Sequence, residues 1–201
     1  MMREPSAKFT ILVDFDDTLN NFLDVWVEYL NETHGTTVKK EDIKEWDITK
    51  AFPTINVQDI FSPLRTEEFW ERVKPLPGAV EYLQKLIDDG HNVCIVTASH
   101  PETVTVKLNS VLFKYFPYLS YKNVIVAYQK HLIKGQIIID DSVDNILGGF
   151  RYLGLLMDAP HNASCDVINL EDGPTDGVIR VNNWEEIYRI ITEYANTFFI
   201  I

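Results

Sequence analysis

Three aspartates, Asp14, Asp16 and Asp17, stand directly after the apolar run 9–13. Carboxylates this close repel one another, and the end of a buried strand offers little water to weaken that repulsion. A nearby cation would make the arrangement tolerable. The first question that the sequence raises is therefore which positive charge these carboxylates share.

Other side chains able to do chemistry follow the later apolar runs of the chain. They are two hydroxyls, one ammonium group and two further carboxylates: Thr97, Ser99, Lys130, Asp140 and Asp141. Because the carboxyl ends of parallel strands meet at one edge of a sheet, we expect these groups to converge with the first aspartates. A hard divalent cation, above all Mg²⁺, suits the carboxylates. The ammonium and hydroxyl donors suit a phosphoryl group.

The elements that must position these residues can be predicted from hydrophobic patterning. Short apolar runs without alternation predict strands buried on both faces, at 9–13, 92–96, 123–127, 136–139 and 152–157. Between and after them, apolar residues at helical spacing predict helices at 78–90, 101–116 and 184–198. Alternating strands and helices predict an α/β fold, a doubly wound parallel sheet with helices on both faces.

The segment 20–74 interrupts this alternation. It is rich in Trp, Phe and Glu, has helix-like patterning, and contains no strong apolar run. We expect a small helical cap inserted after the first strand, with 1–19 and 75–201 forming the core domain. Since ligands bind beyond the carboxyl ends of the strands, such an insertion would lie over the site.

The composition excludes several classes of function. Thirty acidic against eighteen basic residues give a net charge of −12, which disfavours binding to nucleic acid polymers or anionic membranes. Two cysteines without metal-ligand spacing indicate a reducing compartment. The sequence has no signal-peptide pattern at its start and no run of about 20 apolar residues. We therefore expect a cytoplasmic protein.

The motifs resemble those of the haloacid dehalogenase (HAD) superfamily of phosphatases. "DFDDTL" (14–19), "IVTAS" (95–99), Lys130 and "IIIDD" (137–141) are similar to its four motifs, in the same order. The sequence resembles more closely the 5'(3')-deoxyribonucleotidase family. That further similarity lies in "EDIKEWDIT", "PLPGAVEYLQKL", the spacing from Lys130 to Gly135 and Asp141, and "RVNNWEEI". The resemblance implies a HAD-like Rossmannoid core and a phosphatase acting on nucleoside monophosphates.

The resemblance also implies a two-step phosphoryl transfer. Asp14 would be the nucleophile that forms an aspartyl-phosphate. Asp16 would protonate the leaving alkoxide and later deprotonate the attacking water. Mg²⁺ would bind the Asp14 carboxylate, the Asp16 backbone carbonyl and the Asp141 carboxylate. Asp140 would belong to the metal site without contacting the ion directly. We expect no catalytic role for Asp17.

Phosphate and nucleoside contacts are implied in the same way. Thr97, the backbone N–H of Ala98 and Lys130 would bind the phosphoryl oxygens. In the cap, Phe22 would lie beside the sugar and base, and Trp46 would line the base pocket. An apolar pocket there would favour a deoxyribose, because a buried 2'-hydroxyl without a partner costs about 1–3 kcal/mol.

Four positions depart from the nucleotidase pattern. Asp17-Thr18 replaces Gly-Val, Tyr128 stands where relatives often have Arg, and Val143 replaces Pro. Tyr128 removes a positive charge near the phosphate, which leaves the substrate class open. The sequence likewise leaves open which base is preferred, whether the sugar is deoxyribose or ribose, and whether the phosphate is 5' or 3'. It also leaves open whether the chain forms a homodimer.

Simpler interpretations exist for each residue taken alone. Asp14 and Asp16 could end a strand and cap a helix, and Thr97 could cap a helix. Lys134 competes with Lys130, although spacing to Gly135 favours Lys130. Four histidines lack ligand spacing and are expected at the surface: His91, His100, His131 and His161.

Alternative functions are a HAD phosphatase for another small ester such as a sugar phosphate, a receiver-like signalling domain, and a non-catalytic nucleotide-binding protein. The order of the motifs argues against the receiver, in which the carboxylate pair comes early. All the expected catalytic positions are filled, which argues against a non-catalytic relative.

Overall fold

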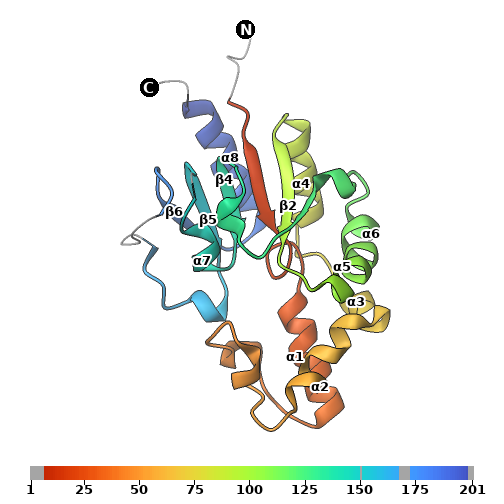
Figure 1. Ribbon diagram of the computed structural model, residues 1–201. Helices are drawn as coiled ribbons and strands as arrows, with labels where there is room; N and C mark the ends of the chain where they lie inside the picture. The colour runs from red at the N-terminus through yellow and green to blue at the C-terminus, as the bar shows by residue number, and fades with distance from the viewer. Residues whose placement is uncertain (1–6, 150, 168–172, 199–201) are drawn as a thin grey trace.

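The computed structural model describes residues 7–149, 151–167 and 173–198 (Figure 1). Six parallel strands form one sheet in the order β3-β2-β1-β4-β5-β6. Their bounds are β1 Thr10–Asp14, β2 Asn92–Thr97, β3 Val124–Val126, β4 Ile137–Asp140, β5 Leu153–Met157 and β6 Val178–Val181. The predicted doubly wound α/β fold is confirmed. Residues 1–6, which belong to the N-terminal segment without a signal-peptide pattern, lie outside the described residues.

β1 lies in the middle of the sheet, as its buried residues predict. Leu12 pairs with Cys94 of β2 on one side and Ile138 of β4 on the other. The chain adds strands outward from β1 in both directions, so the order of the sheet reverses between β1 and β4. In sheets of this kind ligands bind at that reversal, beyond the carboxyl ends of the strands.

The two faces of the sheet carry unequal cores. On one face, Ile11 and Val13 of β1 join the large apolar cluster, which α4 (Ala79–Asp88) and α8 (Trp184–Thr197) also enter. On the other face, Leu12 joins a smaller cluster with Ile146 of α7 (Val143–Ile146). Side chains alternate across a strand, so adjacent residues of β1 hold both layers to the sheet.

The predictions differ from the structure at two elements. β6 was not predicted, because its four residues form a short edge strand that includes the charged Arg180. The predicted helix 101–116 is three segments: α5 (Pro101–Lys107), a π-helical turn (Leu108–Leu112) and α6 (Phe113–Tyr115). A π turn often lies at a functional site, and this one follows directly after Lys107.

Between β1 and α4 the described chain forms helices and turns, with one isolated β-bridge between Asn20 and Pro75. The helices are α1 (Phe22–His34), α2 (Val57–Phe61) and α3 (Glu67–Arg72), with 3-10 turns at Lys40–Asp42, Ile48–Lys50 and Ser62–Arg65. In Figure 1 this segment lies beyond the carboxyl ends of the strands. Its two ends are joined by backbone hydrogen bonds from Asn21 to Lys74 (3.0 Å) and from Leu76 to Leu19 (2.9 Å).

None of the described helices combines the length and the apolar character needed to cross a membrane.

Candidate active site

The turn after β1 is held from two sides. Asp14 is the last residue of β1 and is buried. The side-chain amide of Asn20 donates to the carbonyl of Phe15 at 2.8 Å. The indole N–H of Trp184, on α8, donates to the carbonyl of Thr18 at 2.8 Å. These bonds fix the backbone that carries the predicted catalytic pair.

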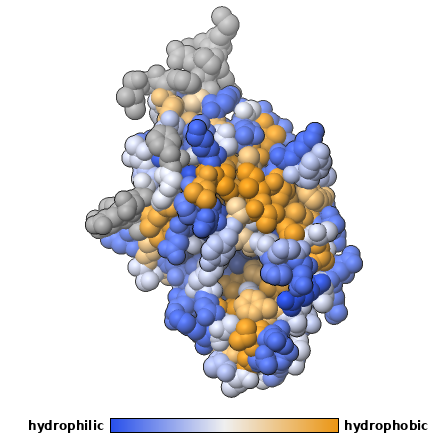
Figure 2. All heavy atoms as spheres, viewed as in Figure 1, coloured by the Kyte–Doolittle hydropathy of each residue, from blue (hydrophilic) through white to orange (hydrophobic). Residues whose placement is uncertain are grey.

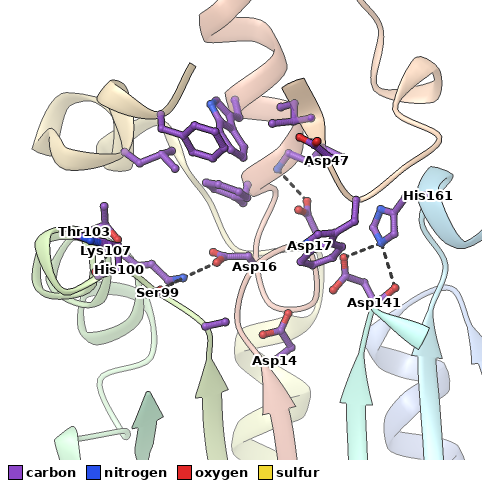
Figure 3. A pocket seen from close by; sticks show the side chains of 18 of the residues that line it. Asp14, Asp16, Asp17, Asp47, Ser99, His100, Thr103, Lys107, Asp141 and His161 are labelled. Atoms are coloured by element: carbon purple, nitrogen blue, oxygen red, sulfur yellow. Dashed lines mark hydrogen bonds and ion pairs between the residues drawn. The ribbon is translucent and has the colours of Figure 1, made fainter. Parts of the chain in front are cut away.

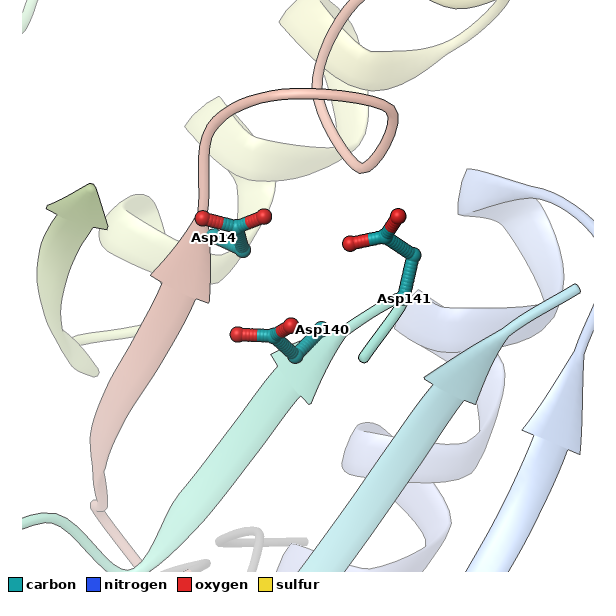
Figure 4. A group of neighbouring side chains, drawn as sticks. All are labelled: Asp14, Asp140 and Asp141. Carbon is teal, nitrogen blue, oxygen red and sulfur yellow. The ribbon is translucent and has the colours of Figure 1, made fainter. Parts of the chain in front are cut away.

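Three buried carboxylates meet at the reversal of the sheet (Figure 4). Asp14 ends β1, and Asp140 and Asp141 end β4 or follow it directly. One carboxylate oxygen of each lies within 4.8 Å of the others. Burial, with repulsion from the other two carboxylates, raises the pKa of Asp141 well above its usual range. Such a cluster of oxygen ligands could hold a metal ion.

Lys130 is buried between two of these carboxylates. Its ammonium group donates to Asp14 Oδ1 and, at 2.7 Å, to Asp140 Oδ2. Burial by itself would lower the pKa of Lys130, but the two carboxylates outweigh it and raise the pKa. Burial and repulsion by Asp14 raise the pKa of Asp140 to about 6, against the attraction of Lys130. One lysine therefore neutralises only part of the charge of three carboxylates.

Asp140 and Asp141 differ in how their oxygens are used. Asp140 Oδ1 accepts from the backbone N–H of Ser142 (2.9 Å) and from Asn145 Nδ2 (3.0 Å), while Oδ2 accepts from Lys130. Asp141 lines the pocket, and its Oδ1 is buried with no hydrogen-bond partner among the described residues. An orphaned buried oxygen calls for a ligand. Asp141 is therefore better placed than Asp140 to bind a cation directly.

The loop after β5 supports Asp141. His161 Nε2 lies 3.2 Å from Asp141 Oδ2 and 3.1 Å from its carbonyl oxygen (Figure 3). Asn162 Nδ2 donates to the same carbonyl at 2.7 Å. Arg180 Nη1 in turn donates to Asn162 Oδ1 at 2.6 Å. Together these contacts fix the backbone and the side chain of the predicted metal ligand.

Two of the histidines expected at the surface are not there. His91 is buried, and the side chain of His161 lies against Asp141. For His161 a signal existed in the sequence, because it follows the predicted strand 152–157 at the edge where the other polar residues gather.

Lys107 is a second buried cation at the site and was not predicted. It ends α5, and its ammonium group contacts Asp16 Oδ2, Thr97 Oγ1 (2.8 Å) and Ser99 Oγ (2.7 Å). In the sequence it shares a helical face with Val104 and Val111, at spacings of three and four residues. A lysine on an apolar helix face was the signal that could have identified it.

Asp17 lines the same pocket as Asp14 and Asp16. It adopts the left-handed conformation with φ 55°, which Asp reaches more readily than most residues. Its Oδ1 accepts from the backbone N–H of Leu23 in α1 at 2.9 Å. Burial, with repulsion by Asp141, raises its pKa well above the usual range. Its contact is with the helical segment.

A pocket of about 580 Å³ unites the core residues with the helical segment. Figure 2 shows the hollowed face between the two parts of the molecule. Most of the predicted site residues line it: Asp14, Asp16, Phe22, Trp46, Ala98, Lys130 and Asp141. Thr97 and Asp140 are buried and do not line the pocket, but they contact the lining residues Lys107 and Lys130. Tyr128, 88% exposed, does not line the pocket.

The two predicted cap residues differ in how far they are packed against other side chains of the pocket. Phe22 stacks on Trp70 with 5.3 Å between ring centroids and 11° between ring planes. Trp46 is 67% exposed, and its ring meets that of His161 edge-on at 5.3 Å. Phe22 therefore belongs to a packed apolar wall, whereas Trp46 forms an open rim beside the carboxylates.

Comparisons with known proteins identify the family of this chain. Residues 8–198 match the family model for 5' nucleotidase, deoxy (pyrimidine), cytosolic type C protein. A 5'(3')-deoxyribonucleotidase of Bacillus subtilis is 33% identical over 183 residues, covering 90% of this chain and 98% of the relative. A 5'(3')-deoxyribonucleotidase of Clostridium acetobutylicum is 34% identical over 157 residues, covering 78% and 86%.

Solved structures show the same fold at low sequence identity. A HAD family hydrolase of Deinococcus radiodurans, with bound phosphate and sodium, aligns with a TM-score of 0.60 and 15% identity, covering 96% of this chain and 97% of the other. The putative HAD-hydrolase YfnB of Bacillus subtilis, bound to magnesium, aligns with a TM-score of 0.52 and 15% identity, covering 92% and 98%.

Proposed function

Because this chain belongs to the 5' nucleotidase, deoxy (pyrimidine), cytosolic type C family and is a phosphoric monoester hydrolase, we propose that it hydrolyses pyrimidine deoxyribonucleoside monophosphates. The observation that carries this proposal is the group of three buried carboxylates beside Lys130, two of which, Asp14 and Asp141, line a pocket that has an aromatic wall. A pocket of this volume suits a small molecule.

In the first step Asp14 acts as the nucleophile. A carboxylate oxygen of Asp14 bonds to phosphorus, and the ester P–O bond breaks. The departing nucleoside oxygen takes a proton from Asp16. Burial raises the pKa of Asp16, which supports a carboxyl group that carries this proton when the substrate binds.

In the second step a water oxygen bonds to phosphorus and gives its proton to Asp16. The bond between phosphorus and the Asp14 oxygen breaks, so that inorganic phosphate leaves and both carboxyl groups return to their starting state. Lys130 and the backbone N–H of Ala98 bind the phosphoryl oxygens and stabilise their negative charge in both transition states. Thr97, which was expected to bind them too, is fully buried, does not line the pocket and contacts Lys107 instead.

Mg²⁺ is the cofactor we propose for the carboxylate cluster. The orphaned Asp141 Oδ1 and the repulsion among the carboxylates support a hard cation there. Asp14, Asp141 and the backbone carbonyl of Asp16 would hold it, while Asp140 holds Lys130. When bound, the cation neutralises charge on the carboxylates and polarises the phosphoryl group.

Residues 20–74 act as the cap, and 1–19 with 75–201 as the core. The joined ends of the insertion support a unit that can move as one body against the sheet. Within it, Phe22 contributes an apolar wall for the deoxyribose and Trp46 a face for the base. The cytoplasmic location stays a prediction.

A substrate screen with Mg²⁺ tests this proposal. It should include deoxy- and ribonucleoside monophosphates with 5' and 3' phosphates, together with sugar phosphates. We expect phosphate release to be fastest with pyrimidine deoxyribonucleotides. Asp14→Asn should abolish turnover with the fold intact, whereas Asp144→Asn, on an exposed residue outside the pocket, should retain it. Full turnover by Asp14→Asn, or folded protein without activity on any phosphate ester, would contradict the mechanism.

A further inference from the structure

Lys107 is a charged residue that is buried at the site. Its side chain is 2% exposed, and its ammonium group lies 5.0 Å from the ring centre of Phe15 and 5.6 Å from that of Trp70. The π-helical turn begins at the next residue, Leu108. Burying an ammonium group is costly unless its charge and its donors are satisfied, so the contacts of Lys107 need an explanation.

All the donors of Lys107 are used within the protein. An ammonium group has three N–H donors, and Lys107 faces three acceptors: Asp16 Oδ2, Thr97 Oγ1 and Ser99 Oγ. Lys130 differs, because its ammonium group contacts two acceptors among the described residues, Asp14 and Asp140. Lys130 therefore keeps a donor for a phosphoryl oxygen, whereas Lys107 has none left for substrate.

The contact with Lys107 divides the two oxygens of Asp16. Oδ2 is bound to the ammonium group (Figure 3). Oδ1 is buried and has no hydrogen-bond partner among the described residues. Asp16 also lines the pocket beside Asp14. One oxygen is thus held while the other is left for a proton.

The same contact orients the two hydroxyl groups. Thr97 and Ser99 each present an oxygen lone pair to Lys107, because an ammonium group can only donate. Their own O–H groups must then point elsewhere, and because the two oxygens lie 3.3 Å apart, one hydroxyl can donate to the other while the second stays available as a donor. Lys107 in this way joins the loop after β2 to the turn after β1.

We propose that Lys107 is a positioning residue, which holds Asp16 so that its Oδ1 transfers the proton to the leaving group. This inference rests on the proposed function, in which Asp16 is the proton donor. Nothing in it requires Lys107 to touch substrate. Removing Lys107 should therefore slow the first step mainly where the leaving group needs a proton.

The experiment compares two leaving groups in four proteins. Wild type, Lys107→Met, Asp16→Asn and the double variant are assayed for the first step by rapid mixing. The substrates are dUMP, which leaves as an alkoxide, and p-nitrophenyl phosphate, whose phenolate leaves without a proton. We expect Lys107→Met to slow the dUMP step roughly 100-fold, with a loss at least about ten times smaller for p-nitrophenyl phosphate. In the Asp16→Asn background, Lys107→Met should add little further loss with dUMP.

Other outcomes would overturn the proposal. Equal losses with both substrates would make Lys107 a phosphate ligand, and additive losses in the double variant would separate it from Asp16. No loss at all would leave it without a role in the reaction.

Two controls keep the test interpretable. Lys114→Met alters an exposed lysine on the following helix, outside the pocket, and should behave as wild type. If Lys107→Met does not fold, Lys107→Gln, which keeps N–H donors without charge, replaces it. If wild type hydrolyses no nucleotide, the proposed function fails, and an alkyl phosphate in place of dUMP still tests Lys107.

Discussion

Asp17 Oδ1 accepts a hydrogen bond from the backbone N–H of Leu23 at 2.9 Å, so the turn that carries Asp14 and Asp16 also caps α1. Asn21, at the N-cap of that helix, makes no side-chain cap. A residue six positions before Leu23 therefore satisfies one of the donors that a helix start leaves free. The contact ties the position of the helical segment to the catalytic turn.

Replacing Asp17 should affect stability according to whether the acceptor is kept. Asp17→Ala loses the cap and places Ala at φ 55°, so we expect unfolding to become easier by about 1–3 kcal/mol. Asp17→Asn keeps an acceptor, tolerates this conformation and removes the repulsion from Asp141, and should be close to neutral or stabilising. Urea denaturation measures both. Equal losses in the two variants would show that the cap is not what Asp17 contributes.

Mg²⁺ should stabilise the protein through Asp141. A ligand at 100 times its Kd adds about 2.7 kcal/mol to the free energy of unfolding, which raises the Tm of a chain of this length by roughly 5–10 °C. Thermal unfolding with EDTA and with increasing Mg²⁺ measures the shift.

Asp141→Asn should separate metal binding from fold stability. Burial and the neighbouring carboxylates disfavour the ionised form of Asp141 in the folded state, so the variant should be more stable than wild type in EDTA near pH 7. It should also lose most of the Mg²⁺ shift. Asp144→Asn should keep the shift of wild type. A full shift in Asp141→Asn would place the cation elsewhere.

The sequence was sufficient to predict that the residues at the ends of the strands lie close together. Asp14, Asp140 and Asp141 each follow an apolar run, and the rule that parallel strands share a carboxyl edge brings them together without any side-chain information. The segment 20–74 was assigned as helical from the loss of strand patterning. Both predictions depend on the secondary structure of short stretches of the chain, which the spacing of apolar residues predicts well.

The residues that the sequence did not reveal act across longer distances. Lys107 is buried because Phe15, Trp70 and Asp16 enclose it from other elements. Asn162 supports Asp141 from a loop after β5. Their roles depend on which elements pack together in three dimensions, and a lysine or asparagine taken alone is usually a solvated side chain.

His91 should make stability depend on pH. It is buried, its Nδ1 lies 3.2 Å from the backbone nitrogen of Phe9 and accepts that N–H, and the rings of the two residues stack. Burial, with repulsion by Lys8, lowers the pKa of His91 below its usual 6.5. Protonation is thus easier in the unfolded chain. Above pH 6.5 His91 is neutral in both the folded and the unfolded chain, so it does not affect stability. As the pH falls below 6.5 the unfolded chain binds a proton first, and the free energy of unfolding decreases.

Replacing His91 tests that dependence. Urea denaturation at pH 7.5 and 5.5 should show a loss of stability for wild type that is smaller in His91→Gln, which cannot be protonated. His100→Gln, on an exposed histidine, serves as the matched control and should keep the full loss. The same loss in His91→Gln as in wild type would assign the pH dependence to other groups.

Selectivity for deoxyribose should depend on Phe22. This ring lines the pocket and is fixed against Trp70, so a ribose 2'-hydroxyl beside it would be buried without a partner. A cost of about 1–3 kcal/mol predicts that kcat/KM for dUMP exceeds that for UMP by about 5- to 150-fold. Phe22→Tyr offers a hydroxyl partner and should narrow this ratio by raising the value for UMP, whereas Phe22→Leu stays apolar and should keep UMP the poorer substrate. Equal kcat/KM for the two nucleotides in wild type would remove the apolar-wall mechanism, and an unchanged ratio in Phe22→Tyr would place Phe22 away from the sugar.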